Sequence, residues 1–249
     1  MKFVKEQTHE MCVIAVNKNP TALEYVQNQT PEICLVAVRK NGEALKYVRD
    51  QTKEICLAAI NKTKRAFRYV NDKNHEICLD IVKKNGLLLR IIEEPTHEIC
   101  LEAVKQNGLA LYFVTDQTKE ICEIAVKQDA FAIKYVEKQT PELCLMAVKQ
   151  KCATLEYIEK QTEEMCLIAV KQNGLMLQFV NKQTEAICLA AVNQDVLAFD
   201  YSDFQSLEIC YIAALKDKRI IDKIKDEKIK RQIKEQLSYG NVKSARSTR

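Results

Sequence analysis

Ten of the eleven cysteines in the chain recur at a constant spacing of 22 residues. They are Cys12, Cys34, Cys56, Cys78, Cys100, Cys122, Cys144, Cys166, Cys188 and Cys210. A fixed period of about 20–50 residues indicates a stacked repeat protein, because each unit buries its apolar face against its neighbours. We therefore expect function to lie on a repeated surface and not in a single catalytic cleft.

The repeat unit contains two helix-capping positions. We number its positions 1 to 22 from Gln7, so that copy 2 reads QTPEICLVAVRKNGEALKYVRD. Position 2 is Thr in eight copies, with Asn74 and Ser206 in the others, and such side chains cap helix N-termini. Position 13 is Asn, Asp or Thr in every copy except that of Lys151, which predicts a second cap. Each unit should thus hold two helices of about nine residues, which begin at positions 3 and 14.

The apolar positions support helices over the rival repeat fold, the leucine-rich repeat. Positions 5, 6, 9 and 10 form one helical face and positions 16, 17, 19 and 20 another. A leucine-rich repeat also fits a period of 22, but it requires alternating leucines on a strand. The pattern favours an all-α solenoid of about ten two-helix repeats.

The repeats divide the chain into four segments. Residues 1–6 resemble the end of a second helix, residues 7–215 form the array, and residues 216–239 are a predicted amphipathic capping helix. Residues 240–249 form a basic tail that we expect to be disordered. Because the first copy follows only a stub, we also expect self-association through the N-terminal end.

The cysteine ladder is interpreted as a set of small buried side chains. Packed helices lie about 8–10 Å apart, too far for disulfides between copies, and no C-x-x-C pair or recurring histidine indicates a metal. Free thiols suit a reducing compartment, so we expect a cytoplasmic protein. Cys152 stands outside the ladder and is the expected exposed thiol.

The sequence contains no recognisable catalytic or cofactor motif. His9, His75 and His97 all occupy position 3, where solvated surface residues are expected. The recurrent Asn-Gly pairs do not follow a strand, so they are interpreted as turns between helices. We expect no enzyme activity, no cofactor, no metal site and no membrane span, since no 18-residue apolar run occurs.

Position 15 is the candidate partner-binding stripe, because it becomes apolar in the later copies. Such residues either extend the core or form an exposed stripe that binds a partner, paired with position 19 at the α-helical i, i+4 spacing. The stripe consists of Leu87, Leu109, Phe131, Leu175 and Leu197.

Lysines at positions 11 and 12 form a candidate basic ridge. They either complement the helix dipole or follow a phosphate backbone. Residues 216–249 carry a net +7 in a chain of +4, so residues 1–215 carry about −3, which weakens the nucleic-acid interpretation. The ridge consists of Lys40, Lys62, Lys84, Lys105, Lys127, Lys149 and Lys171.

The stretches AVKQNGLAL at 103–111 and AVKQNGLML at 169–177 resemble a family of short helical repeats of unknown function. That family occurs in giant viruses, some protists and some bacteria, so the resemblance implies an α-helical repeat and, for a viral member, the host cytoplasm. It implies no catalytic or ligand-binding residues. We expect a non-catalytic scaffold that binds an unknown protein partner, with nucleic-acid binding and structural self-assembly as alternatives.

Overall fold

The computed structural model describes residues 4–247, and the side chains of residues 4–238. It is an all-α repeat solenoid that is 73% helical, and no strand occurs in the described range. The α-helices are α1 (His9–Lys18), α2 (Pro31–Lys40), α3 (Lys53–Lys62), α4 (His75–Lys84), α5 (His97–Gln106), α6 (Lys119–Gln128), α7 (Pro141–Gln150), α8 (Glu163–Gln172), α9 (Glu185–Gln194), α10 (Leu207–Lys216) and α11 (Glu227–Ser247).

Each of the first ten α-helices is followed by a short 3₁₀-helix (η). These are η1 (Pro20–Tyr25), η2 (Gly42–Tyr47), η3 (Lys64–Tyr69), η4 (Gly86–Ile91), η5 (Gly108–Phe113), η6 (Ala130–Tyr135), η7 (Cys152–Tyr157), η8 (Gly174–Phe179), η9 (Val196–Tyr201) and η10 (Lys218–Lys223).

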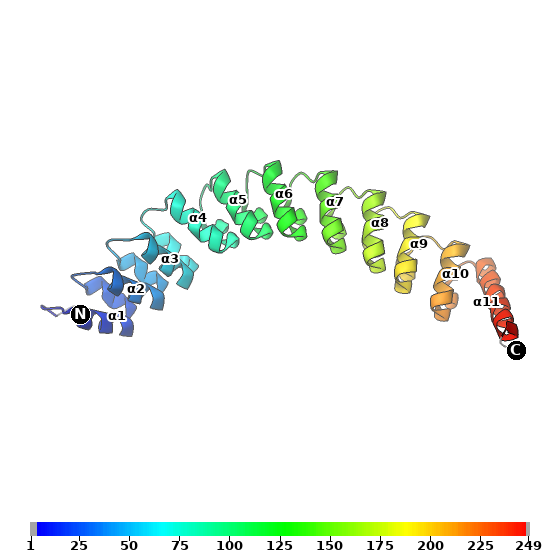
Figure 1. The fold of residues 1–249 in the computed structure, drawn as a ribbon, viewed down its shortest axis with the longest axis horizontal. Helices are drawn as coiled ribbons and strands as arrows, with labels where there is room; N and C mark the ends of the chain where they lie inside the picture. Colours follow the sequence, from blue (N-terminus) through cyan, green and yellow to red (C-terminus); the bar gives the residue numbers. More distant parts are fainter. Residues whose placement is uncertain (1–3, 248–249) are drawn as a thin grey trace. The chain divides into compact units, whose positions relative to one another are not determined.

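The chain divides into two compact units, Met1–Thr115 and Asp116–Arg249. The first unit holds α1–α5 with η1–η5, and the second holds α6–α11 with η6–η10. Within each unit, successive α-helices pack against one another, and each α-helix also packs against its own 3₁₀-helix (Figure 1). The core is therefore a row of small contacts between neighbouring copies, as a solenoid requires.

The predicted first helix is confirmed in all ten copies. It begins at position 3, and the side chain at position 2 accepts a hydrogen bond from the backbone N–H at position 5, as Thr30 does from Ile33. Pro31 and Pro141 occupy the first helical position, where the missing N–H costs nothing. Its buried face consists of positions 5, 6, 9 and 10, as in Ile33, Cys34, Ala37 and Val38.

The predicted length of the second helix was wrong. It is a six-residue 3₁₀-helix from position 14 to position 19, after which the buried position 20 turns to extended backbone, as at Val48 (φ −76°, ψ 123°). In a 3₁₀-helix residues i and i+3 eclipse, so positions 15 and 19 do not share a face as the predicted i, i+4 pairs would. The extended linker that follows carries the chain to the next cap.

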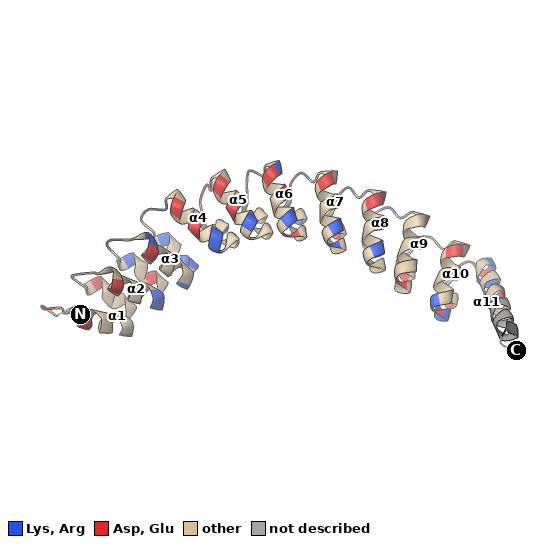
Figure 2. Cartoon of the chain, viewed as in Figure 1, with Lys and Arg blue, Asp and Glu red and all other residues tan. Residues whose placement is uncertain are grey.

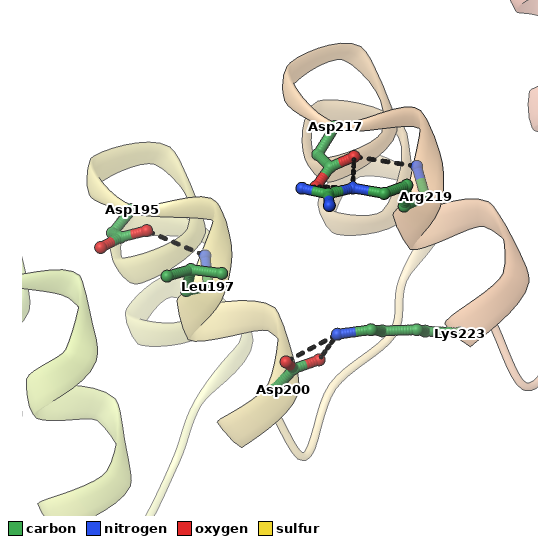
Figure 3. Close-up of polar contacts among 6 residues, drawn as sticks. All are labelled: Asp195, Leu197, Asp200, Asp217, Arg219 and Lys223. Atoms are coloured by element: carbon green, nitrogen blue, oxygen red, sulfur yellow. Dashed lines mark hydrogen bonds and ion pairs between the residues drawn. The ribbon is translucent and has the colours of Figure 1, made fainter.

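Side-chain capping at position 13 is confirmed for most copies. Asp195 accepts a hydrogen bond from the N–H of Leu197, and Asp217 accepts one from the N–H of Arg219, both at 2.9 Å (Figure 3). Thr63 and Lys151 hold the same backbone conformation without this bond. Position 13 thus starts the 3₁₀-helix as position 2 starts the α-helix.

The glycine of the Asn-Gly pairs serves close packing and not a turn conformation. No glycine among the described residues has a positive φ. A Cβ atom on Gly86 would lie 2.2 Å from the carbonyl oxygen of Ala103 in the next copy. The glycine therefore lets a 3₁₀-helix approach the following α-helix.

The C-terminal segment differs from its expected bounds. Residues 216–226 complete a regular tenth copy that includes η10, and the terminal helix α11 begins at Glu227 instead of residue 216. The helix continues to Ser247, past residue 240 where a tail was expected, and residues 248–249 lie outside the described range. Ile233 of α11 is fully buried, while Lys234 is exposed, so the helix has one apolar face and one charged face.

Candidate functional site

In eight of the ten copies, a glutamine at position 1 connects the linker to the helices. Gln29 donates hydrogen bonds from Nε2 to the carbonyl oxygens of Leu23 and Tyr47, and its Oε1 accepts from the N–H of Arg49. The residues with this role, which we call the clamp glutamines, are Gln7, Gln29, Gln51, Gln117, Gln139, Gln161, Gln183 and Gln205. Sequence reasoning missed this role, although the recurrence of Gln at position 1 was a visible signal.

The clamp glutamine also explains why the ladder residue is cysteine. In seven copies the thiol donates to the glutamine Oε1, at 3.0–3.9 Å. The ten ladder cysteines are buried and form no disulfides, as expected, and Cys152 is the half-buried exception. Burial raises the pKa of the Cys144 and Cys210 thiols to about 11, so these cysteines are poor nucleophiles at neutral pH.

The position-15 stripe divides between core and surface. Leu87 and Leu109 of the first unit, and Phe131 and Leu175 of the second, are half-buried. Leu197 is 53% exposed. Four of the five side chains are therefore partly covered by the fold and one is exposed, and partner binding by the stripe stays a prediction.

Aromatic contacts at the 3₁₀-helices run between copies. The rings of Phe131, at position 15, and Tyr157, at position 19 of the next copy, meet edge to face with centroids 6.2 Å apart. The ammonium group of Lys134 lies 4.7 Å from the Tyr135 centroid and 5.9 Å from that of Tyr157. Position 15 of one copy here meets position 19 of the next, although the two positions lie on different faces of a single 3₁₀-helix. We call the side chains at positions 15, 18 and 19 along successive 3₁₀-helices the aromatic face.

The exposed members of the aromatic face are large. Tyr112 is 65% exposed and Tyr25 is 39% exposed in the first unit, and Tyr201 is 44% exposed in the second. Lys46 lies 4.7 Å from the centroid of the Tyr47 ring, and a side-chain hydrogen bond to Tyr47 raises the pKa of this lysine. Exposed tyrosines beside cations resemble the composition of protein interfaces.

All seven lysines of the predicted basic ridge are exposed in the last turns of α2–α8. Figure 2 shows acidic residues at the first turn of helices such as α4 and α5, the opposite end of the helix dipole. Lys40 has a structural contact, because its ammonium group donates to the carbonyl oxygen of Asn17 in the preceding copy. Gln150 makes the equivalent bond to Lys127, so position 12 caps the neighbouring helix whether it is Lys or Gln.

Position 3 pairs with position 4 of the next copy. His9 lies 3.1 Å from Glu32, His75 lies 3.0 Å from Glu98, and Lys53 lies 2.6 Å from Glu76. These positions are 23 residues apart, so their pairing was not predicted from the repeat pattern. His9 and His75 therefore make a cross-repeat contact, and all three histidines are exposed, as expected.

The N-terminal stub is described only from Val4. Val4 is half-buried and residues 4–6 are not helical, while Phe3 lies outside the described residues. Self-association through this end stays a prediction.

The searches for a metal and for a membrane span gave no candidates. Within residues 4–238, no group of three or more His, Cys, Asp or Glu side chains could hold a metal ion. Among the helices described, none is both long enough and apolar enough to cross a bilayer.

Comparison with protein families identifies a repeated domain. The model of a domain of unknown function, DUF4116, matches residues 30–74, 96–140, 140–185 and 162–227. Comparisons with curated proteins and with solved structures gave no match. The first match begins at the cap residue of copy 2 and ends at that of copy 4, so one domain spans two of the 22-residue copies. Since the matches cover more than half of the sequence, the chain belongs to the DUF4116 family.

Proposed function

We propose that this protein is a non-catalytic scaffold that binds a protein partner through the aromatic face of its 3₁₀-helices. The exposure of Tyr112, Leu197 and Tyr201 is the observation that carries the proposal. Large side chains at such exposure do not serve the core, and tyrosine binds partners at low entropic cost. The ten ladder thiols are not joined in disulfides, which suits a reducing compartment, so we propose that this role is in the cytoplasm.

Repetition makes the aromatic face suitable for an extended partner. Each copy presents the same positions 15, 18 and 19, so a partner segment meets similar contacts at successive copies. Several weak contacts on one chain combine into higher avidity without any single deep pocket. The variation in position 18, which is Tyr112, Lys134 or Asp200 in different copies, would select among partners.

The proposal is tested with a double substitution, Leu197→Asp with Tyr201→Asp. Both side chains are exposed, so folding should persist while binding is lost. Leu215→Asp is the matched control, since Leu215 is 57% exposed but lies on α10 outside the aromatic face. The tagged proteins are used for affinity capture from lysate with and without nuclease, and circular dichroism checks their folding.

Partners that are retained after nuclease, lost with the double variant and kept with the control would support the scaffold. Recovery that disappears with nuclease would contradict it and favour nucleic-acid binding by the exposed lysines of the ridge. Light scattering of the purified protein tests the remaining alternative, since a concentration-dependent mass would indicate self-assembly.

A further inference from the structure

Eight copies of the repeat contain the same receptor for a carboxamide group. In each of them the N–H at position 21 donates to the clamp glutamine Oε1, at 2.9–3.1 Å. In seven of them the glutamine Nε2 donates to the carbonyl oxygen at position 19. The linker thus presents one donor and one or two acceptors, the complement of a primary amide.

The clamp glutamine is absent from copy 5, where Pro95 takes its place, and from copy 4. Its position 1 is Lys73, whose ammonium group lies 5.4 Å from the centroid of the Phe67 ring. The thiol of Cys78 donates to the backbone carbonyl of Lys73 instead of to a side-chain amide. The lysine side chain therefore does not replace the clamp.

A pocket opens at this place in the first unit. It has a volume of about 730 Å³ and is lined by Phe67, Lys73, Cys78, Ile92, Glu93 and Glu94. The N–H of Glu93, which corresponds to the clamped N–H of other copies, has no hydrogen-bond partner among the described residues. By position in the repeat, the acceptors that a glutamine uses in other copies correspond to the carbonyls of Phe67 and Ile91. The linker of copy 4 differs at Glu94, which has a φ of 49°.

We propose that this pocket binds a primary carboxamide from outside the chain, presented by a glutamine side chain of a peptide segment. The amide oxygen accepts from the N–H of Glu93, and the amide nitrogen donates to the carbonyls of Phe67 and Ile91. A carboxylate is disfavoured, because it cannot donate to those carbonyls and because the pocket is lined by two carboxylates, Glu93 and Glu94, against the one ammonium group of Lys73. This site uses the N–H of Glu93 in the linker of copy 4 and backbone carbonyls of η3 and η4, and not the side chains of the aromatic face, so it stands apart from the function proposed above.

The volume of the pocket fits this class of ligand. A single carboxamide would leave most of the space unfilled, whereas a glutamine with its flanking peptide groups would also contact Phe67 and Ile92. Phe67 is 6% exposed and forms an apolar wall, while Glu93 and Glu94 are exposed at the mouth.

The experiment is an NMR titration of the ¹⁵N-labelled full chain with N-acetylglutamine methylamide. Saturable shifts of the Glu93 and Ile92 amide signals are expected, with affinity at least about tenfold tighter than for the matching glutamate compound. Acetamide is titrated in parallel, because a free small amide and a glutamine in a peptide both present a carboxamide. Tighter binding of the glutamine compound supports a peptide ligand, and equal binding overturns that part of the proposal.

Two substitutions of Lys73 test whether the pocket is the vacant position of a clamp glutamine. Lys73→Gln should supply the amide from within the chain, abolish the shifts and raise the melting temperature. Lys73→Ala leaves the receptor open, so it should bind the glutamine compound as the unchanged protein does. Equal shifts with the glutamate compound, or undiminished binding by Lys73→Gln, would overturn the proposal.

Discussion

At the scale of single residues, the clamp glutamine links several parts of the repeat through hydrogen bonds of one side chain. Gln29 joins the end of η1, the end of η2 and the linker after it, and it also accepts from the thiol of Cys34. Amide groups that satisfy backbone donors and acceptors are expensive to remove, because the partners lose their bonds while partly shielded from water. Glutamine therefore recurs for its hydrogen bonds.

Replacement of Gln29 by Ala should lower the free energy of unfolding by about 1–3 kcal/mol. The loss comes from the unsatisfied carbonyl of Tyr47 and N–H of Arg49. Urea denaturation measures the effect, with Gln27→Ala as the control because the Gln27 side chain is exposed. Equal effects of the two substitutions would contradict the clamp.

The buried cysteines should make the fold sensitive to alkali. Burial raises the pKa of the Cys144 and Cys210 thiols to about 11. The unfolded chain then loses protons near pH 9 while the folded chain keeps them, so stability is complete below that pH and falls as pH rises toward 11. The fall should be on the order of 1–3 kcal/mol per buried thiol, because one pKa unit is worth about 1.4 kcal/mol.

Denaturation curves between pH 8 and pH 11 test this dependence. A variant with Cys144→Ala and Cys210→Ala is less stable at neutral pH, but its stability should depend less steeply on pH above 9. An unchanged slope in that variant would show that other groups cause the alkaline loss.

At the scale of the element, the α-helix was predictable and the 3₁₀-helix was not. The start and the buried face of α2 are predicted from sequence alone, by the cap at position 2, the proline at position 3 and the apolar spacing. The second segment carries a similar cap and apolar pattern, but the 3₁₀ geometry follows from contacts with the next copy, such as the approach of Gly86 to Ala103. The sequence pattern within one copy does not predict such contacts between copies.

The candidate site shows the same division. The repeat spacing alone identified position 15 as a candidate. Its exposure depends on the neighbouring copies, which leave Phe131 half-buried and Leu197 exposed. The cation–aromatic contacts of Lys134 depend on side chains in two copies, so no single unit predicts them.

The caps of the 3₁₀-helices offer a test at this scale. Thr63 makes no capping bond to η3, although its φ of −150° is close to the −153° of Asn85, which caps η4. Thr63→Asn should supply the missing bond and raise the free energy of unfolding by about 0.5–1 kcal/mol. Asn85→Ala should lower it by about 1 kcal/mol. Denaturant unfolding measures both, and a destabilised Thr63→Asn would contradict the capping role.

At the scale of the whole molecule, a stack of repeats is held by contacts between neighbours, so stability should vary along each unit. In the second unit, α11 packs on α10 and covers the last copy. Its Ile233 is fully buried, while Lys228, Arg231, Lys234 and Glu235 are exposed. The charged side chains of α11 face solvent where another copy would otherwise stack, which is the property of a terminal cap.

Substitution of Ile233 by Asp should therefore loosen one end of the second unit and not all of it. A charge in this fully buried place cannot be paired, so α11 should separate from α10 and expose the apolar face that includes Ile209. Hydrogen exchange should rise in α11, η10 and α10, while α7 and α8 keep their protection because they contact only nearer copies. Lys234→Asp is the matched control, since Lys234 is the exposed neighbour on the same helix. Uniform loss of protection from α6 to α11 would instead mean that the unit unfolds as a single cooperative block.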